Sequence, residues 1–105
     1  MKEVTVEELK KMIDAKEDIQ IIDVREVSEY QAANIDGVLI PLSTVPQNTD
    51  KISKDKKVIV HCRSGKRSAN AIAFLEANHG YDNLYNLVGG ILAWKDKIDP
   101  TINAV

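Results

Sequence analysis

VIVHCRSGKRSAN, residues 58–70, changes in character at its centre. Its first residues, VIVH, are mostly β-branched and predict a short buried strand. The only cysteine of the chain, Cys62, follows that strand and begins a loop that contains a glycine and three cations. Helix-forming residues then run from Ser68 to His79, and Gly80 stands where a helix C-terminus favours glycine. The stretch therefore predicts strand, loop and helix in succession, with a lone thiol at the strand end.

Strand and helix signals alternate along the rest of the chain. Thr5 and Glu8 form a capping-box pattern at the start of a first helix. Further helices are expected at 26–33 and 91–98, and further strands at 19–24, 38–41 and 83–90. The polar segment 44–57 is expected to be a loop with a helical turn. Because strands that alternate with helices pair in parallel through right-handed crossovers, the pattern predicts an α/β fold with a mainly parallel sheet.

Composition limits the class of protein. A chain of 105 residues fits one compact domain. Its residues are 44% hydrophobic and 29% charged, a composition that is typical of soluble globular proteins. No apolar run is long enough to span a membrane, and the N-terminal MKEVTVEELKKM is acidic where a signal peptide is apolar. We therefore expect a cytoplasmic monomer with a reduced thiol and no membrane association. The formal net charge of -2 argues against a nucleic-acid binder, which would need a basic face.

The loop after the strand has the features of an anion site built around a thiol. Ligands of parallel sheets bind beyond the carboxyl ends of the strands, which is where Cys62 stands. Backbone N–H groups at a helix start attract anions, and Arg63, Lys66 and Arg67 add positive charge. Lowering the pKa of the Cys62 thiol by one unit requires about 1.4 kcal/mol. One or two charge-assisted hydrogen bonds of about 1.5–3 kcal/mol each are therefore sufficient to ionise it at neutral pH. The sequence therefore predicts a nucleophilic Cys62 that is ionised at neutral pH.

Other interpretations of residues 58–70 are a core cysteine, a catalytic histidine, a phosphate-binding loop and a zinc site. A lone cysteine after a strand is often a buried core residue without a reactive role. Here its position at the strand end, before the cationic loop, favours a reactive cysteine instead. His61 should point to the opposite face from Cys62, so we expect a structural histidine. A phosphate-binding P-loop would need glycine at Val60 and serine or threonine at Arg67. A zinc site would need more ligands than one cysteine and two separated histidines, so no metal is expected.

Four segments together resemble the single-domain rhodanese sulfurtransferases. They are IIDVREVSEY, NIDGVLIPLS, VIVHCRSGKRSANA and NLYNLVGGILAW, and their order and spacing cover nearly all of the chain. The most specific are the loop from Cys62 to Ser68 and the ending from Gly89 to Trp94. The resemblance implies one rhodanese domain over residues 1–105, with a five-stranded mainly parallel sheet and helices on both faces.

The resemblance also implies a reaction without an external cofactor. Cys62 would take the outer sulfur of thiosulfate or another sulfane donor as a persulfide, and a thiol or cyanide would then accept it. The side chains of Arg63, Lys66 and Arg67 would hold the sulfonate-like end of the donor. Backbone amides would hold the terminal sulfur; these belong to Ser64, Gly65, Lys66, Arg67 and Ser68.

Residues outside the loop have expected roles that are mainly structural. Asp23 and Arg25, at the end of a neighbouring strand, either brace the loop or form an ordinary strand-end ion pair. Gly89 and Gly90 are expected to permit a tight turn near the site, and Trp94 to pack the last helix on the sheet. The family usually has histidine and proline where this chain has Asn34 and Asp36, which leaves the rigidity of that turn open.

Two other functions remain as alternatives. Dual-specificity phosphatases, which share this fold, place five residues between cysteine and arginine, whereas four separate Cys62 from Arg67. The shorter ring should be too tight for a phosphoryl group, and no general acid is evident. Alternatively, the domain is a persulfide carrier or interaction module in a sulfur relay between proteins. An acidic partner would then dock at Arg63 and Lys66.

Overall fold

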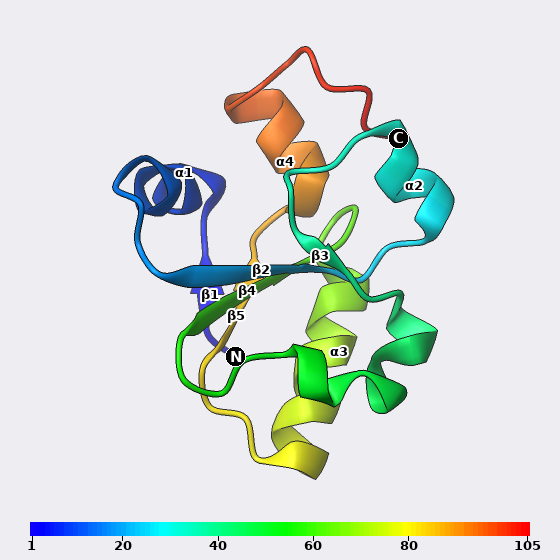
Figure 1. The fold of residues 1–105 in the computed structure, drawn as a ribbon. Helices are drawn as coiled ribbons and strands as arrows, with labels where there is room; N and C mark the ends of the chain where they lie inside the picture. Colours follow the sequence, from blue (N-terminus) through cyan, green and yellow to red (C-terminus); the bar gives the residue numbers. More distant parts are fainter.

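A five-stranded parallel sheet forms the centre of the computed structural model, which describes residues 1–105 (Figure 1). The strands lie in the order β1-β5-β4-β2-β3. The strands are β1 (Glu3–Val4), β2 (Ile19–Asp23), β3 (Val38–Leu39), β4 (Lys57–His61) and β5 (Leu84–Leu87). The helices are α1 (Val6–Asp14), α2 (Val27–Ala32), α3 (Lys66–His79) and α4 (Gly90–Lys97), with two 3-10 helices, η1 (Leu42–Gln47) and η2 (Thr49–Lys51). The predicted α/β fold is confirmed, and none of the helices is long and apolar enough to cross a membrane.

The two faces of the sheet are covered by different helices. Figure 1 shows α1, α2 and α4 above the sheet and α3 with the 3-10 helices below it. Along the central strand β4, Val58 and Val60 pack in the core cluster that contains the buried residues of α3. Ile59, which points the other way, packs with Leu9 of α1 and Trp94 of α4. Helices therefore cover both faces, as predicted, and this explains why β4 is apolar at consecutive positions.

The alternation of β4 continues one residue beyond the strand. Cys62 belongs to the same core cluster as Val58 and Val60, although regular pairing ends at His61. His61 is fully buried and pairs in register with Asp23 of β2. The expectation that His61 and Cys62 face opposite ways is therefore confirmed, and the thiol is on the side of α3.

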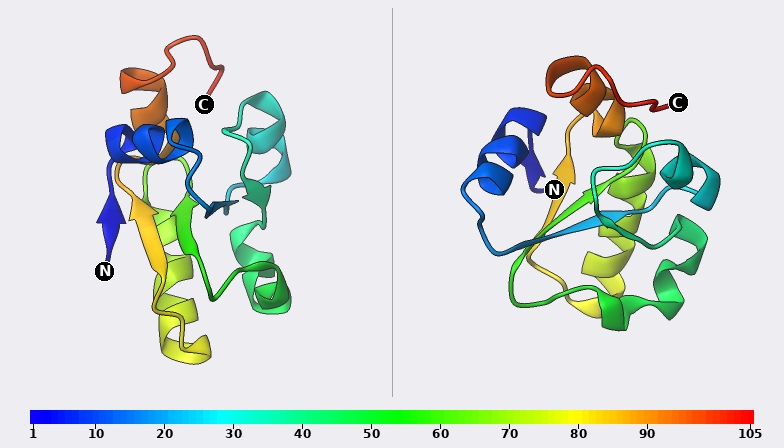
Figure 2. Two further views of the ribbon diagram at one scale, coloured as in Figure 1. Left: turned by 60° about the vertical axis from the view of Figure 1, so that its left-hand side comes forward. Right: turned by 45° about the horizontal axis from the view of Figure 1, so that its top comes forward.

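Several local features differ from the sequence-based expectations. The strands expected at 38–41 and 83–90 are shorter, Val38–Leu39 and Leu84–Leu87. Strand β1 has two residues, too few for a periodic signal, and exists because Glu3 and Val4 pair with the exposed edge of β5 (Figure 2). Helix α3 begins at Lys66 rather than Ser68. Its first turn contains Lys66 and Arg67, and positive side chains are unfavourable at a helix N-terminus. The sequence alone therefore predicts a start that is two residues too late. The segment expected as a loop with one helical turn contains two 3-10 helices, η1 and η2.

The turn before β3 explains the departure from the family pattern. Asp36 has a φ of 64°, which proline cannot adopt because its ring holds φ near about -65°. Asn34 stabilises the turn from both sides, since its Oδ1 accepts from the Asp36 N–H at 2.9 Å and its Nδ2 donates to the Tyr30 carbonyl at 3.2 Å. This chain thus has its own ordered turn at 34–36 in place of one built on proline.

The turn between β5 and α4 is where glycine is required. Gly89 and Gly90 have φ values of 78° and 60°, and a Cβ on Gly90 would lie 2.5 Å from the carbonyl oxygens of both Cys62 and Arg63. The next two amides bind those same carbonyls, Ile91 N–H to Cys62 at 3.0 Å and Leu92 N–H to Arg63 at 3.2 Å. The expected tight turn near the site is confirmed, and it docks the start of α4 on the loop that follows β4.

Replacing Gly90 with alanine should therefore destabilise the protein severely. Gly80 has a similar φ of 66° but open space around it, so it provides a matched control. We expect Gly80→Ala to lower the free energy of unfolding by about 1–2 kcal/mol through backbone strain alone. Gly90→Ala should lower it by about 3 kcal/mol or more, because the clash adds to the strain. Urea denaturation measures both values, and equal losses would contradict the close approach.

Candidate active site

Three hydrogen-bonding groups surround the sulfur of Cys62. The Gly65 N–H donates to Sγ at 3.1 Å, the Ser68 N–H lies at 3.4 Å, and the Ser68 hydroxyl also lies at 3.4 Å. The thiol is 1% exposed. The loop therefore folds around the sulfur as a ring of donors, which is the arrangement that stabilises a sulfur anion.

The loop takes this shape because both of its ends are fixed. Its first residues follow β4 and are held by the α4 amides, and its last residues are the first turn of α3. Gly65, at the N-cap of α3, has a φ of 112°, a conformation that other residues rarely adopt. The chain can thus reverse within three residues and point the Gly65 N–H back at the sulfur.

Opposing effects act on the acidity of the thiol. Burial raises the pKa of Cys62, whereas hydrogen bonds lower it, from the Ser68 hydroxyl and N–H first and then from the N–H groups of Gly65 and Ser64. The hydrogen bonds outweigh burial, so the pKa of Cys62 lies below its ordinary value. This agrees with the predicted nucleophile: the groups that achieve it are mainly loop N–H and O–H donors, and the Arg67 guanidinium adds an electrostatic attraction to the sulfur.

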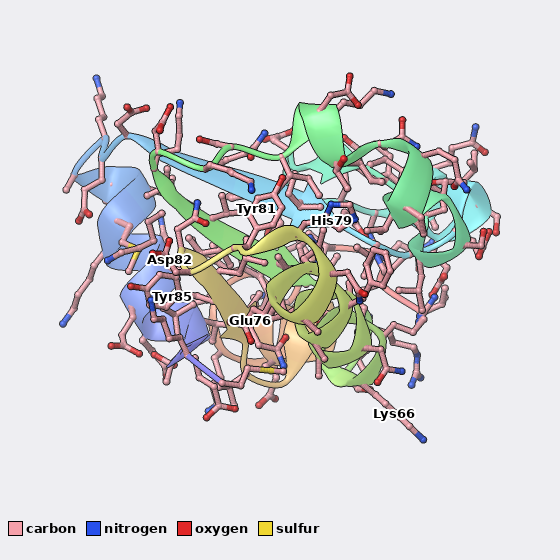
Figure 3. The ribbon with its side chains drawn as sticks, turned by 90° about the horizontal axis from the view of Figure 1, so that it is seen from below. Lys66, Glu76, His79, Tyr81, Asp82 and Tyr85 are labelled. Atoms are coloured by element: carbon pink, nitrogen blue, oxygen red, sulfur yellow. The ribbon has the colours of Figure 1, made fainter.

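The structure separates the three cations of the loop. The side chains of Arg63 and Lys66 are exposed, and Lys66 projects away from the body of the protein at the start of α3 (Figure 3). Arg67 instead forms a bidentate ion pair with Glu29 of α2, at 2.8 and 2.9 Å. This hydrogen-bonded partner lowers the pKa of Glu29 to about 2. Glu29 had no signal in the sequence that linked it to the loop, because 38 positions separate it from Arg67.

Asp23 and Arg25 form a buried ion pair that reaches α2 rather than the loop. Arg25 binds both carboxylate oxygens of Asp23, at 2.8–3.1 Å, and both side chains are fully buried. Its remaining donors bind the backbone carbonyls of Glu29 at 3.3 Å and Ala33 at 2.7 Å. The pair is therefore an ion pair at the strand end that also holds the helix carrying Glu29, and it reaches the loop only indirectly, through the contact of Glu29 with Arg67.

Neither histidine contributes to the site. His61 is buried beside Asp23, with Nε2 3.5 Å from Oδ2, and burial lowers its pKa. His79 lies at the opposite end of α3 from Lys66 (Figure 3), where its ring packs against Phe74. The structural reading of His61 is consistent with this placement, since its ring faces away from the sulfur.

One buried residue near the sulfur was not anticipated from the sequence. Asn86 on β5 donates from Nδ2 to the Gly65 carbonyl at 3.1 Å, and its Oδ1 accepts from the Ser68 hydroxyl at 2.6 Å. The available signal was an amide between apolar residues near the carboxyl end of a buried strand, where ligand sites of parallel sheets occur.

Comparison with known proteins finds relatives in sequence and in fold. The family model described as Rhodanese-like domain matches residues 5–97. A protein of Allochromatium vinosum named "Sulfurtransferase" is 37% identical over 93 residues, which cover 88% of this chain and 86% of that protein. "Putative sulfur carrier protein YrkF" of Bacillus subtilis is 33% identical over 98 residues, which cover 92% of this chain and 52% of that protein. The crystal structure of a rhodanese-like domain protein from Staphylococcus aureus superimposes with a TM-score of 0.82 at 36% identity, covering 93% of this chain and 95% of that one.

The ion pair between Glu29 and Arg67 should contribute stability that depends on pH. Because the pKa of Glu29 falls from 4.5 to about 2 on folding, its contribution is present above pH 4.5 and is lost as the pH falls toward 2. We expect Glu29→Gln to lower the free energy of unfolding by about 1 kcal/mol at pH 7, and the difference from wild type to vanish toward pH 2. Glu7→Gln, at an exposed pair with Lys97, is the control and should have almost no effect. A difference between Glu29→Gln and wild type that does not vary with pH would contradict the pair.

The acidity of Cys62 can be measured by alkylation. We expect the rate of iodoacetamide reaction to reach half its maximum at a lower pH in the folded protein than in the same chain unfolded in urea. Limited access of iodoacetamide to the thiol will slow the reaction at every pH without moving this midpoint. Coincident midpoints would show that the ring of donors leaves the thiol unperturbed.

Proposed function

The chain belongs to the rhodanese-like domain family, and on this premise we propose that it transfers sulfane sulfur from thiosulfate through a persulfide on Cys62. Its relatives include a sulfurtransferase and a protein named as a sulfur carrier, which supports sulfur transfer in general. The observation that carries the proposal of a persulfide is the buried thiol with the N–H groups of Gly65 and Ser68 at 3.1 and 3.4 Å from its sulfur, which suits a sulfur anion. Because the nucleophile must remain reduced, we place the reaction in the cytoplasm.

The first half-reaction begins with the thiolate. The Cys62 sulfur attacks the outer sulfur of thiosulfate, and a new S–S bond forms. The S–S bond of thiosulfate breaks, its electron pair leaves with sulfite, and Cys62 retains a persulfide anion. No proton, metal or external redox partner is needed, because the total charge is the same before and after the step.

The loop is suited to holding the extra sulfur. The N–H groups of Lys66 and Arg67 lie in the first turn of α3, where backbone donors have no intrahelical acceptor. Together with the amides of Ser64, Gly65 and Ser68 they would surround the terminal persulfide sulfur. The exposed cations Arg63 and Lys66 would attract the doubly charged donor and hold its sulfonate end, whereas the Arg67 guanidinium, expected from the sequence to join them, is paired with Glu29.

The second half-reaction returns the enzyme to its starting state. A cyanide ion or a thiolate attacks the terminal sulfur, the persulfide S–S bond breaks, and its electron pair returns to Cys62. The products are thiocyanate or a new persulfide on the acceptor. A partner protein that carries the accepting thiol would make the same chemistry a sulfur relay. The similarity to a sulfur carrier protein favours this second candidate function, and an acidic surface would match Arg63 and Lys66.

Phosphate hydrolysis is disfavoured by the same loop. Four residues separate Cys62 from Arg67, and the Arg67 guanidinium is occupied by Glu29 on its two terminal nitrogens. A phosphatase would need that guanidinium to face the phosphoryl oxygens.

Intact mass spectrometry tests the persulfide directly. Incubation with thiosulfate should add one sulfur atom to the wild type and none to Cys62→Ser. Subsequent cyanide should remove the added sulfur while thiocyanate appears in solution. If the free thiol gains no sulfur from thiosulfate, that donor is wrong. A persulfide-bearing protein then becomes the donor to offer, and gain of sulfur from it alone would favour the relay.

A further inference from the structure

Asn86 of β5 has a polar side chain that is buried in the core. It is 7% exposed, and its backbone is fixed on both sides by pairing with Glu3 of β1 and Val60 of β4. Burying an amide is unfavourable unless its donor and acceptor are both satisfied. Here both ends of the carboxamide bind the Cys62 loop, to Gly65 and to Ser68.

The two residues that Asn86 holds are also the two that hold the sulfur. Gly65 and Ser68 supply the contacts to Sγ at 3.1 and 3.4 Å. The Ser68 hydroxyl lies between the carboxamide, at 2.6 Å from Oδ1, and the sulfur, at 3.4 Å. The chain of contacts thus runs from a rigid strand, through one amide, to the donors around the thiol.

Gly65 is the part of the loop that most needs such an anchor. Glycine can adopt the observed φ of 112°, but it can adopt many other conformations as well. The identity of the residue therefore does not by itself fix the direction of the Gly65 N–H. The hydrogen bond from the Asn86 amide to the Gly65 carbonyl, together with that from the Ala69 N–H to the same oxygen at 3.1 Å, holds Gly65 in one conformation.

We propose that Asn86 is a positioning residue, which keeps the N–H groups of Gly65 and Ser68 directed at Cys62 and thereby keeps the sulfur anionic and reactive. The Ser68 hydroxyl has a single hydrogen, which it donates to Asn86, so the backbone N–H of Ser68 is the group that binds the sulfur. The proposal rests on the proposed function for its significance, because an anionic sulfur is what persulfide chemistry requires. It does not depend on thiosulfate, since the effect is exerted on the free thiol.

A matched control exists one residue before the same strand. Asn83, just before β5, also donates its amide to two backbone carbonyls, those of Ser53 at 2.8 Å and Lys56 at 2.7 Å. Neither acceptor belongs to the Cys62 loop. Asn83→Ala should therefore destabilise the protein without changing the thiol, as any purely structural amide would.

The test measures the pH midpoint of iodoacetamide alkylation in Asn86→Ala, Asn86→Leu and Asn83→Ala, with no sulfur donor present. Leucine fills the volume of asparagine, so Asn86→Leu remains informative if the alanine variant does not fold. We expect both Asn86 variants to raise the midpoint and to slow alkylation at pH 7 by about three- to tenfold, while Asn83→Ala matches wild type. In a Ser68→Ala background, removing Asn86 should have a smaller effect, because part of its action passes through the hydroxyl.

Either of two results would overturn the proposal. One is an Asn86 midpoint equal to that of Asn83→Ala, which would make the amide purely structural. The other is a lowered midpoint, which would mean that Asn86 competes with the sulfur for the Ser68 hydrogen. Sulfur loading from thiosulfate is measured separately on the same variants. If wild type fails to load, the proposed function fails, while the midpoints still decide the role of Asn86.

Discussion

The contact between the start of α4 and the end of β4 is the constraint on which the site depends. Two α4 amides bind the carbonyls of Cys62 and Arg63, and the missing side chain of Gly90 allows the approach. Between that contact and the start of α3 the chain reverses at Gly65, whose φ is 112°. The turn directs the Gly65 N–H at the sulfur, so an anion site follows from a backbone packing requirement.

Buried polar groups extend that constraint to the neighbouring elements. Asp23 and Arg25 hold α2 through two backbone carbonyls, and α2 carries the Glu29 carboxylate that binds Arg67. On the other side, Asn86 links β5 to Gly65 and Ser68. The loop is thus supported from β2 through α2 and directly from β5. Such support is what a preorganised site requires, because its donors must face the anion before the anion forms.

The charges of the loop divide into two groups with different physical roles. Arg67 is neutralised by Glu29 and joins the start of α3 to α2 through this ion pair, whereas Arg63 and Lys66 remain exposed. The thiol itself is buried and is stabilised as an anion by short-range hydrogen bonds. Long-range attraction and local stabilisation are therefore supplied by different residues. This division suits a reaction in which a small dianion approaches from water and transfers one neutral sulfur atom to a buried anion.

Local patterns in the sequence were enough to determine the α/β fold, the capping box at Thr5 and Glu8, and the strand, loop and helix around Cys62. Each of these depends on residues a few positions apart, whose periodicity and spacing carry the signal. Only the tertiary structure decided that β1 joins the sheet, that Arg67 is paired, and that Asn86 reaches the loop. These contacts join residues that are 18 or more positions apart in the sequence, and Arg67 is 38 positions from Glu29. No spacing rule connects such residues, because their distance is determined by how the strands order in the sheet.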